Sequence, residues 1–267
     1  MNKLTIAAAI CAALCVSPAQ ARKKPEPTPA KPAPYASTYQ AIASAPVLIQ
    51  NATVLTGTGE RLDNADVLMQ DGKIQAVGKA LSPPGNAKII NGAGKWVTPG
   101  IIDVHSHLGV YANPGIQATS DGNEATNAVT ANVWAEHSVW PQDAGFAKAL
   151  AGGVTSMQIL PGSANLVGGR SVILKNVAAT TFQAMKFPDA PYGIKMACGE
   201  NPKRVYGEKG GPSTRMGNMA GYRAAFIGAE AYRRKWDAYE KGGRQGDAPD
   251  QDLANDTLAG VLRGDVT

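Results

Sequence analysis

The rhythm of the sequence changes at Pro99-Gly100, and this change constrains the fold more than any other feature. From Val47 to that point, runs such as VLIQNATVL and DVLMQDGKIQAVG alternate apolar and polar residues between turn residues, which is typical of short strands. Asp71-Gly72, between two such runs, predicts a β-hairpin. We therefore expect a small antiparallel sheet over residues 47–98, buried on one face and in need of a partner sheet.

After Pro99-Gly100, apolar runs that resemble strands alternate with stretches of helical character, which favours a parallel sheet or barrel over residues 99–267. The predicted strands are IIDVHSH, VTSMQILPG, SVILKNV and YGIKMACGE. Helices are predicted within 124–151, where Gly152-Gly153 would end the helix, and over 219–241 and 252–262. The last residues, 262–267, resemble a helix end followed by the first step of another strand.

The first residues indicate export. Lys3 precedes an apolar stretch from Leu4 to Val16, and Ala19-Gln20-Ala21 is a small-residue cleavage site. This pattern predicts a signal peptide over residues 1–21, cleaved before Arg22, and a periplasmic or extracellular protein. The apolar stretch is shorter than the ~20 residues that a membrane span needs. We therefore expect no stable membrane span after cleavage.

A Pro/Lys-rich linker is predicted over residues 22–46, where RKKPEPTPAKPAP favours an extended, polyproline-like tether. The formal net charge of +5 comes mostly from this end of the chain. Without the five basic residues and one acidic residue of the signal and tether, 21 basic and 20 acidic residues remain. That near balance gives no support to nucleic-acid binding. Cys11 and Cys15 would leave with the signal, so Cys198 would stand alone, more typical of a small core residue than of a nucleophile.

The segment PGIIDVHSH carries the sharpest chemical signal. Side chains alternate faces along a strand, so His105 and His107 would point the same way, roughly 7 Å apart along the backbone. Two imidazoles at a strand end are well placed to hold one divalent metal. Asp103 would share this face, either orienting a histidine ring or serving as a buried structural carboxylate.

These residues carry a family resemblance. TPGIIDVHSH after a run of short strands resembles the opening of the metal-dependent amidohydrolase superfamily. ALAGGVTSMQILPGSANLVGG and GIKMACGENPKRVYG are similar to its imidazolonepropionase- and prolidase-related branch. The resemblance covers Val47 to Thr267. It implies an α/β fold, namely a partial TIM-like (β/α)8 barrel preceded by a small antiparallel β-sandwich segment, with metal at the carboxyl ends of the strands.

The resemblance also implies a hydrolase that acts on the carbon–nitrogen bonds of a small molecule or short peptide, with one or two divalent ions. Zinc suits imidazole ligands and is the expected metal. Similar lysines in the family react with carbon dioxide to form a carbamate that bridges two metals, so Lys195 is a candidate ligand in that form, the alternative being a plain cationic or core-edge lysine. Glu200 is the competing carboxylate ligand. It follows Lys195 by five residues, so a continuous strand would place the two side chains on opposite faces. They could therefore be joint ligands only if a turn intervenes.

Other residues are candidates for substrate contacts. The loop Pro161–Asn165 would lie on the rim of the site, as would Asn201–Arg204. Lys203 and Arg204 would pair with a substrate carboxylate, or else form a solvated turn. His137 is expected on or near the first helix in a surface or capping role rather than at the metal.

The family's later ligands are not found in the sequence. The resemblance implies two further histidines and an aspartate that is a ligand and general base, but no histidine follows position 137. We therefore expect the general base beyond Thr267, a truncated chain that is inactive or incomplete, and an open half-barrel with exposed strand edges. Two alternatives are an exported binding or structural half-barrel without catalysis, and a metallohydrolase with a reduced site.

Overall fold

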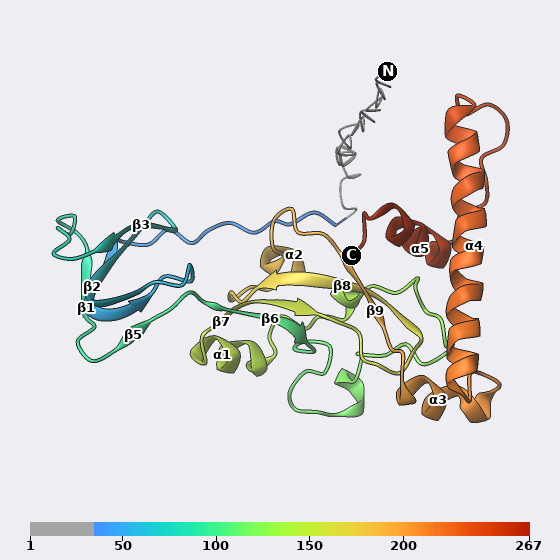
Figure 1. The fold of residues 1–267 in the computed structure, drawn as a ribbon, viewed down its shortest axis with the longest axis horizontal. Coiled ribbons are helices and arrows are strands. Elements are labelled where there is room, and N and C mark those ends of the chain that lie inside the picture. Colours follow the sequence, from blue (N-terminus) through green and yellow to red (C-terminus); the bar gives the residue numbers. More distant parts are fainter. Residues whose placement is uncertain (1–34) are drawn as a thin grey trace, which may run out of the picture. The chain divides into compact units, whose positions relative to one another are not determined.

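The computed structural model describes residues 35–267 of the chain (Figure 1). The predicted signal peptide with its cleavage site, and the linker up to residue 34, lie outside the described residues. Among the residues that are described, no helix combines the length and apolar character needed to cross a membrane.

The first sheet is formed by strands at the start of the described chain, in the order β3-β2-β1-β4, with β5 also paired to β1. Its strands are β1 (Val47–Leu55), β2 (Arg61–Gln70), β3 (Lys73–Gly78), β4 (Lys88–Asn91) and β5 (Trp96–Val97). The predicted hairpin is confirmed: Gln70 pairs with Lys73, and Asp71 and Gly72 have φ angles of 52° and 71°. Such positive angles are those of a type I′ turn, which matches the twist of the strands.

The prediction of a purely antiparallel first sheet is wrong. β1 and β2 are antiparallel, but β1 pairs in parallel with both β4 and β5. The segment after β3 carries the chain back, so that β4 and β5 run in the same direction as β1. A small core of four residues holds the sheet together: Ala52, Val54, Ala65 and Val67.

The second sheet has the order β6-β7-β8-β9 (Figure 1). Its strands are β6 (Ile101–Ser106), β7 (Val154–Ile159), β8 (Val167–Lys175) and β9 (Gly193–Met196). β6 and β7 are parallel, whereas β8 is antiparallel to both of its neighbours, which corrects the prediction of a parallel sheet. Only residues 160–166 join β7 to β8. Parallel strands need a crossover of a dozen or more residues, so β8 has to run back.

This reversal returns β9 to the direction of β6 and β7, so three carboxyl ends meet at one edge. Tyr192, just before β9, forms a parallel bridge with Val266 near the end of the sequence. This bridge confirms the expected first step of another strand. The fold is therefore α/β, with part of a TIM-like barrel that contains one reversed strand. The apolar side chains of β6 are largely bare, since Ile102 and Val104 are each 68% exposed.

The first predicted helix is shorter in the structure, α4 begins earlier than predicted, and α2 and α3 were not predicted. They are α1 (Ala144–Ala151), α2 (Phe182–Met185), α3 (Glu200–Tyr206), α4 (Arg215–Lys241) and α5 (Leu253–Arg263), with short 3-10 turns η1 (Gln117–Thr119), η2 (Ala135–Ser138) and η3 (Gly207–Lys209). The two predicted late helices are confirmed. α5 begins where the Asp252 side chain accepts the Asn255 N–H.

The prediction of helix over most of 124–151 is wrong, because only α1 forms there. The Asp143 carboxylate starts α1 by accepting the Gly145 N–H, and it also accepts the Gly109 N–H. Upstream, the buried Asn165 amide donates to the carbonyls of Glu124 and Asn127. These tertiary hydrogen bonds hold the segment in an irregular course and replace the bonds a helix would make.

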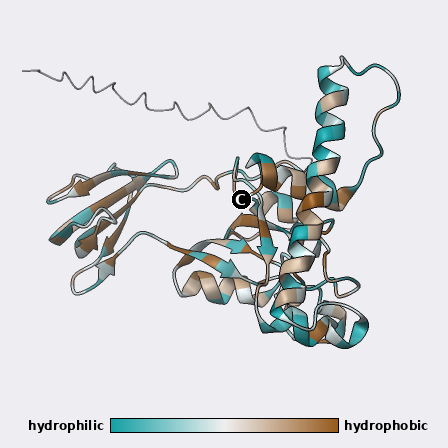
Figure 2. Ribbon diagram, turned by 45° about the vertical axis from the view of Figure 1, so that its right-hand side comes forward, coloured by the Kyte–Doolittle hydropathy of each residue, from teal (hydrophilic) through white to brown (hydrophobic). Residues whose placement is uncertain are grey.

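Two cores cover the second sheet. One lies between β7, β8, α1 and α2 and contains Met157, Ile159, Leu174, Phe146 and Met185. The other lies under α4 and α5 and contains Leu166, Val167, Tyr222, Ala229 and Leu258. Hydrophobic and hydrophilic residues alternate along α4 (Figure 2), as expected for a helix that packs along one side only.

The end of the predicted linker is docked onto the second sheet region. The Ser37 hydroxyl donates to the Lys186 carbonyl, and the Thr38 N–H donates to the Gln183 carbonyl. The Tyr35 ring meets the rings of Trp134 and His137 edge-on, with centroids 5.8 and 4.9 Å away. Residues 35–39 are thus a packed strap and not a free tether.

Candidate metal centre

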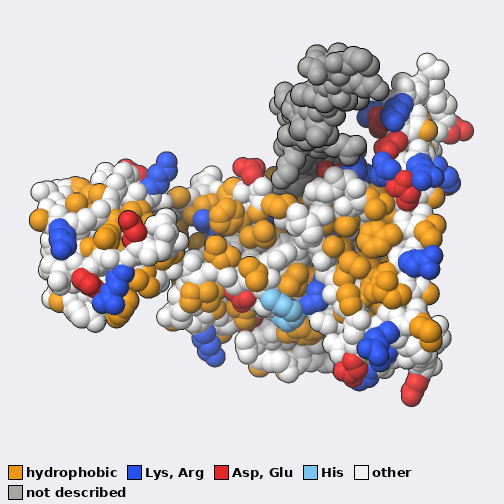
Figure 3. Space-filling model, viewed as in Figure 1, with side chains coloured by type: hydrophobic (Ala, Val, Ile, Leu, Met, Phe, Trp, Pro, Cys, Tyr) orange, Lys and Arg blue, Asp and Glu red, His pale blue; other side chains and the backbone are white. Residues whose placement is uncertain are grey.

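The two histidines of the sharpest motif lie together at the carboxyl end of β6. His105 is within the strand and His107 follows its last residue, and their ring centroids are 5.2 Å apart at an angle of 84°. Histidine side chains reach the surface of one face of the molecule, with a basic side chain beside them and hydrophobic surface around them (Figure 3). The alternation of a strand thus brings both imidazoles to one place.

Asp103 does not orient a ring. Its carboxylate accepts the backbone N–H of His105 at 3.0 Å, and the residue is only half-buried. The sequence leaves two roles open for Asp103, namely orienting a histidine ring or serving as a buried structural carboxylate. The contact with the backbone favours the structural role, although the carboxylate is not fully buried.

The His107 ring is oriented by the neighbouring strand. Its Nδ1 lies 2.9 Å from the Leu160 carbonyl oxygen, just beyond β7. A carbonyl can only accept, so Nδ1 carries the proton and Nε2 keeps its lone pair. A backbone carbonyl is a common partner for the second nitrogen of a metal-binding histidine, because it fixes both tautomer and ring orientation.

Lys195 approaches the same point from β9. Its Nζ lies 3.2 Å from the Nε2 of His105, and the residue is only 7% exposed. Gly168 lies beside it, where a Cβ would be in ordinary van der Waals contact with the Lys195 Cγ at 3.6 Å. Burial lowers the pKa of Lys195 from its usual value. The positive charge of Lys195 is in turn the main reason that the pKa of His105 is lowered, followed by burial and His107, with Asp103 opposing them.

Glu200 is not brought to this cluster. A turn does separate it from β9, but it starts α3, and its exposed carboxylate lies 3.5 Å from the Arg204 guanidinium. Within residues 35–267, no group of three His, Cys, Asp or Glu side chains is close enough to hold a metal ion. A third side-chain donor at the two histidines would therefore be of another kind, and Lys195 is the side chain whose amine contacts His105. Ligation by Glu200 stays a prediction that these contacts do not support.

The predicted substrate residues lie on two different elements. Lys203 and Arg204 are on α3, where Arg204 is engaged with Glu200. The loop Pro161–Asn165 follows β7, as expected, but Pro161 and Asn165 are buried. Asn165 is held by the Tyr206 hydroxyl as well as by the loop before α1. The substrate roles of these residues stay predictions.

Two residues that the sequence does not single out lie at the cluster. The Tyr111 ring packs edge-on against His107, and Asn123 donates a hydrogen bond to the Tyr111 hydroxyl. Tyr111 follows His107 by only four residues, and this closeness in sequence could have marked it as a neighbour of the histidines. Nothing local in the sequence marks Asn123.

His137 and Cys198 differ from expectation in position. His137 lies in η2 rather than near α1, and its half-exposed ring is stacked on Trp134 with centroids 5.8 Å apart. It takes no part in the histidine cluster, as predicted. Cys198 is exposed and not a core residue, because β9 ends at Met196 and the chain turns outward there.

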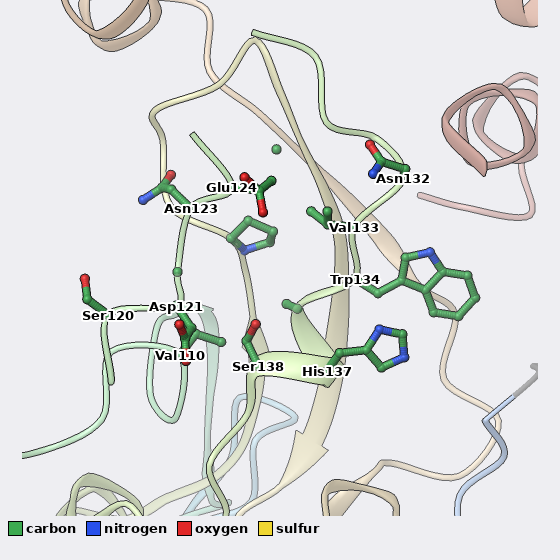
Figure 4. A pocket seen from close by; sticks show the side chains of 14 residues that line it. Val110, Ser120, Asp121, Asn123, Glu124, Asn132, Val133, Trp134, His137 and Ser138 are labelled. Atoms are coloured by element: carbon green, nitrogen blue, oxygen red, sulfur yellow. The ribbon is translucent and has the colours of Figure 1, made fainter. Parts of the chain in front are cut away.

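A polar pocket of about 360 Å³ is lined in part by Pro161 and Gly168 (Figure 4). Its wall includes Asn123, Glu124 and Ser138, and the labelled His137 ring points away from its centre (Figure 4). The clustered histidines and Lys195 do not line this pocket. Gly168 and Asn123 link the two places, since both line the pocket, Gly168 lies against the Lys195 side chain and Asn123 donates to Tyr111.

The chain has an α/β fold with part of a TIM-like barrel. Two histidines and a buried lysine lie at the carboxyl ends of its strands. These features place it in the class of barrel proteins whose chemistry lies at this edge. No family model matches the chain. It is 34% identical over 254 residues to the amidohydrolase tasK of Hapsidospora irregularis, which covers 83% of this chain and 26% of that protein. It is 27% identical over 144 residues to a dihydroorotase of Trichlorobacter lovleyi, covering 53% of this chain and 28% of that protein.

Among solved structures, the crystal structure of an amidohydrolase from Thermotoga maritima superposes with a TM-score of 0.74 at 41% sequence identity. The match covers 81% of this chain and 55% of that one. The chain belongs to the amidohydrolase superfamily. It spans about a quarter of the length of the two curated relatives and about half of the solved structure.

Proposed function

We propose that this chain contributes a divalent metal centre to the hydrolysis of amide-type carbon–nitrogen bonds, with His105, His107 and Lys195 as ligands. The observation that carries the proposal is the 3.2 Å approach of the buried Lys195 amine to His105, beside a histidine whose Nε2 is free. Members of the superfamily are generally dependent on divalent metals, and zinc suits imidazole ligands. When bound, such an ion supplies the Lewis acidity that polarises an amide carbonyl and acidifies a water molecule.

The donor set fits such an ion. Lys195 in its neutral form can attack carbon dioxide, forming a nitrogen–carbon bond and releasing one proton to solvent, so that a carbamate with two anionic oxygen donors results. Burial and the lowered pKa of Lys195 favour the neutral form that this reaction needs. The Leu160 carbonyl keeps the His107 ring in place throughout.

The substrate we propose is a small amide. The relatives include a dihydroorotase of Trichlorobacter lovleyi and a D-hydantoinase of Ralstonia pickettii, names that denote cyclic amide substrates. Short peptides are the other class that the sequence predicts. We also propose that the protein is exported, as the signal-like pattern of residues 1–21 suggests.

A non-catalytic role is the second candidate. Within the described residues no three His, Cys, Asp or Glu side chains come together, and the nearby Asp103 carboxylate accepts the His105 backbone N–H, which favours an exported protein that binds without hydrolysis. The same observation motivates our expectation that this chain binds metal weakly and shows no detectable turnover by itself.

Zinc and cobalt titrations of the full chain test the proposal. We expect a His105→Ala/His107→Ala double variant to lose metal binding and a His137→Ala variant to keep it, because His137 lies outside the cluster. Equal affinities in the two variants would place the metal elsewhere. Hydrolysis is assayed in parallel on hydantoin, dihydropyrimidine and dipeptides, and turnover that needs both histidines would favour the catalytic role over the non-catalytic one.

A further inference from the structure

Tyr111 forms one wall of the proposed metal centre. Its backbone N–H donates to the His107 carbonyl at 3.2 Å, and its ring lies with its centroid 5.9 Å from that of His107, at an angle of 81°. The side chain is partly open to solvent, with Tyr111 39% exposed. A group that enters the centre can therefore reach the ring and its hydroxyl.

The polarity of the Tyr111 hydroxyl is set by Asn123. The Ala164 N–H donates to the Asn123 Oδ1 at 3.0 Å. A backbone N–H can only donate, so the amide oxygen of Asn123 faces Ala164 and its NH₂ group faces Tyr111. That NH₂ group donates to the Tyr111 hydroxyl oxygen. The Tyr111 oxygen is thus used as an acceptor, and its own hydrogen is left to be donated.

No acceptor within residues 35–267 takes that hydrogen. A tyrosine keeps its proton at neutral pH, because its ordinary pKa is about 10. The Tyr111 hydroxyl is consequently a hydrogen-bond donor without a partner among the described residues, a few residues from His107.

The pair is held by two glycines. A Cβ at Gly122 would overlap the Tyr111 ring, and a Cβ at Gly162 would overlap the Asn123 amide, so any larger residue at either position would displace one of the pair. The Gly162 N–H donates to the Gly122 carbonyl at 2.7 Å, which ties the two loops together. These loops follow β6 and β7 at the carboxyl edge, where the proposed metal ligands lie.

We propose that the Tyr111 hydroxyl, aimed by Asn123, donates a hydrogen bond to a carbonyl or carboxylate oxygen of the amide substrate and so helps to determine specificity. This inference rests on the proposed function, because it needs a substrate at the centre. Tyr111 is the residue that contacts the substrate, and Asn123 is a positioning residue that acts through it.

The test is the binding of hydantoin, a neutral cyclic amide, to the zinc-loaded full chain by calorimetry. We expect Tyr111→Phe to weaken hydantoin binding about 3- to 10-fold, the range for one lost hydrogen bond, and to leave zinc affinity unchanged. Tyr39→Phe is the matched control, since the Tyr39 ring lies over Lys175 and away from the histidines. It should change neither affinity.

Asn123→Asp separates aiming from packing. One carboxylate oxygen can still accept the Ala164 N–H, but the other now accepts the Tyr111 hydrogen and turns it away from the substrate. We expect the same loss of hydantoin affinity as in Tyr111→Phe, with the tyrosine intact.

Unchanged hydantoin binding in Tyr111→Phe would overturn the inference, and so would a lack of hydantoin binding by the zinc-loaded chain. In both cases the proposed function would stand, because the chain still binds zinc. Absence of zinc binding by the unmodified chain would instead overturn the proposed function, and the inference with it.

Discussion

Two lysines of the second sheet region are buried to the same degree but have opposite surroundings. Lys186 is 5% exposed and Lys195 is 7% exposed. The Lys186 amine lies 2.7 Å from a carboxylate oxygen of the fully buried Glu136, and it also donates to the Tyr192 hydroxyl and the Tyr35 carbonyl. Among the described residues, no carboxylate lies within ion-pair distance of the Lys195 amine, whose recorded polar contact is the His105 ring.

The surroundings of the two buried amines give them different roles. The Lys186 charge is met by a counter-ion and further acceptors, so its region is closed and structural. The Lys195 amine lacks a counter-ion among the described residues, and burial lowers its pKa, so it can become neutral and react or bind.

The largest effect is expected at Lys186. Replacing it in Lys186→Met leaves the Glu136 carboxylate buried without its partner, which should lower the free energy of unfolding by about 3–5 kcal/mol. Urea denaturation followed by circular dichroism measures this. The double variant Lys186→Met/Glu136→Gln is the control and should recover much of the loss. A Lys186→Met protein as stable as the unmodified chain would remove the contrast between the two lysines.

Lys195→Met should instead change metal binding. We expect zinc affinity to fall by at least about 10- to 100-fold, because the loss of a ligand should cost no less than the loss of a ligand's hydrogen-bond partner. Added bicarbonate should raise zinc affinity in the unmodified chain only, because a thioether side chain cannot form a carbamate. The free energy of unfolding should change by less than about 1 kcal/mol, since no buried counter-ion is abandoned. A bicarbonate effect that persists in the variant would exclude the carbamate.

The pH dependence is a smaller effect. The cationic Lys195 disfavours a second positive charge, so the pKa of His105 lies below its usual 6.5. As pH falls from 6.5 to that lower pKa, the unfolded chain takes up the proton and the folded one does not, so the free energy of unfolding decreases over this interval. Titration of the His105 ring by NMR measures the pKa, and in Lys195→Met it should return toward 6.5. No change in the variant would mean that Lys195 is not the cause.

The smallest effect is expected in the strap that covers Lys186. Tyr35→Ala removes ring contacts with Trp134 and His137 but keeps the backbone carbonyl, so we expect a loss of about 1 kcal/mol in unfolding free energy. Ile42→Ala, where the side chain is 77% exposed, is the control and should be neutral. A loss as large as that of Lys186→Met would show that the strap and the buried ion pair act as one unit.

Local patterns predicted much of this molecule. Two-residue periodicity brought His105 and His107 to one face, turn chemistry predicted the hairpin at Asp71-Gly72, and helical spacing predicted α4 and α5. Each of these features depends on neighbours in the sequence. Lys195 came from the family resemblance, and the structure brings it to His105.

The features that were missed depend on partners far away in the sequence. The Glu136–Lys186 pair joins residues 50 positions apart, and Asn165 holds a loop some 40 residues upstream in an irregular course. Asn123 reaches Tyr111 only because Gly122 and Gly162 let two loops meet. The reversal of β8 was readable from the short connection before it, but strand–helix alternation pointed the other way.

The reversed β8 also bears on the order of folding. β7, β8 and β9 pair with their immediate neighbours in sequence, so these contacts close short loops and cost little chain entropy. Pairing of β6 with β7, by contrast, closes the longer segment 107–153 and so costs more chain entropy. During synthesis, Lys195 would therefore be seated on a three-stranded meander while α4 and α5 are still emerging, and His105 and His107 would be brought to it when β6 docks.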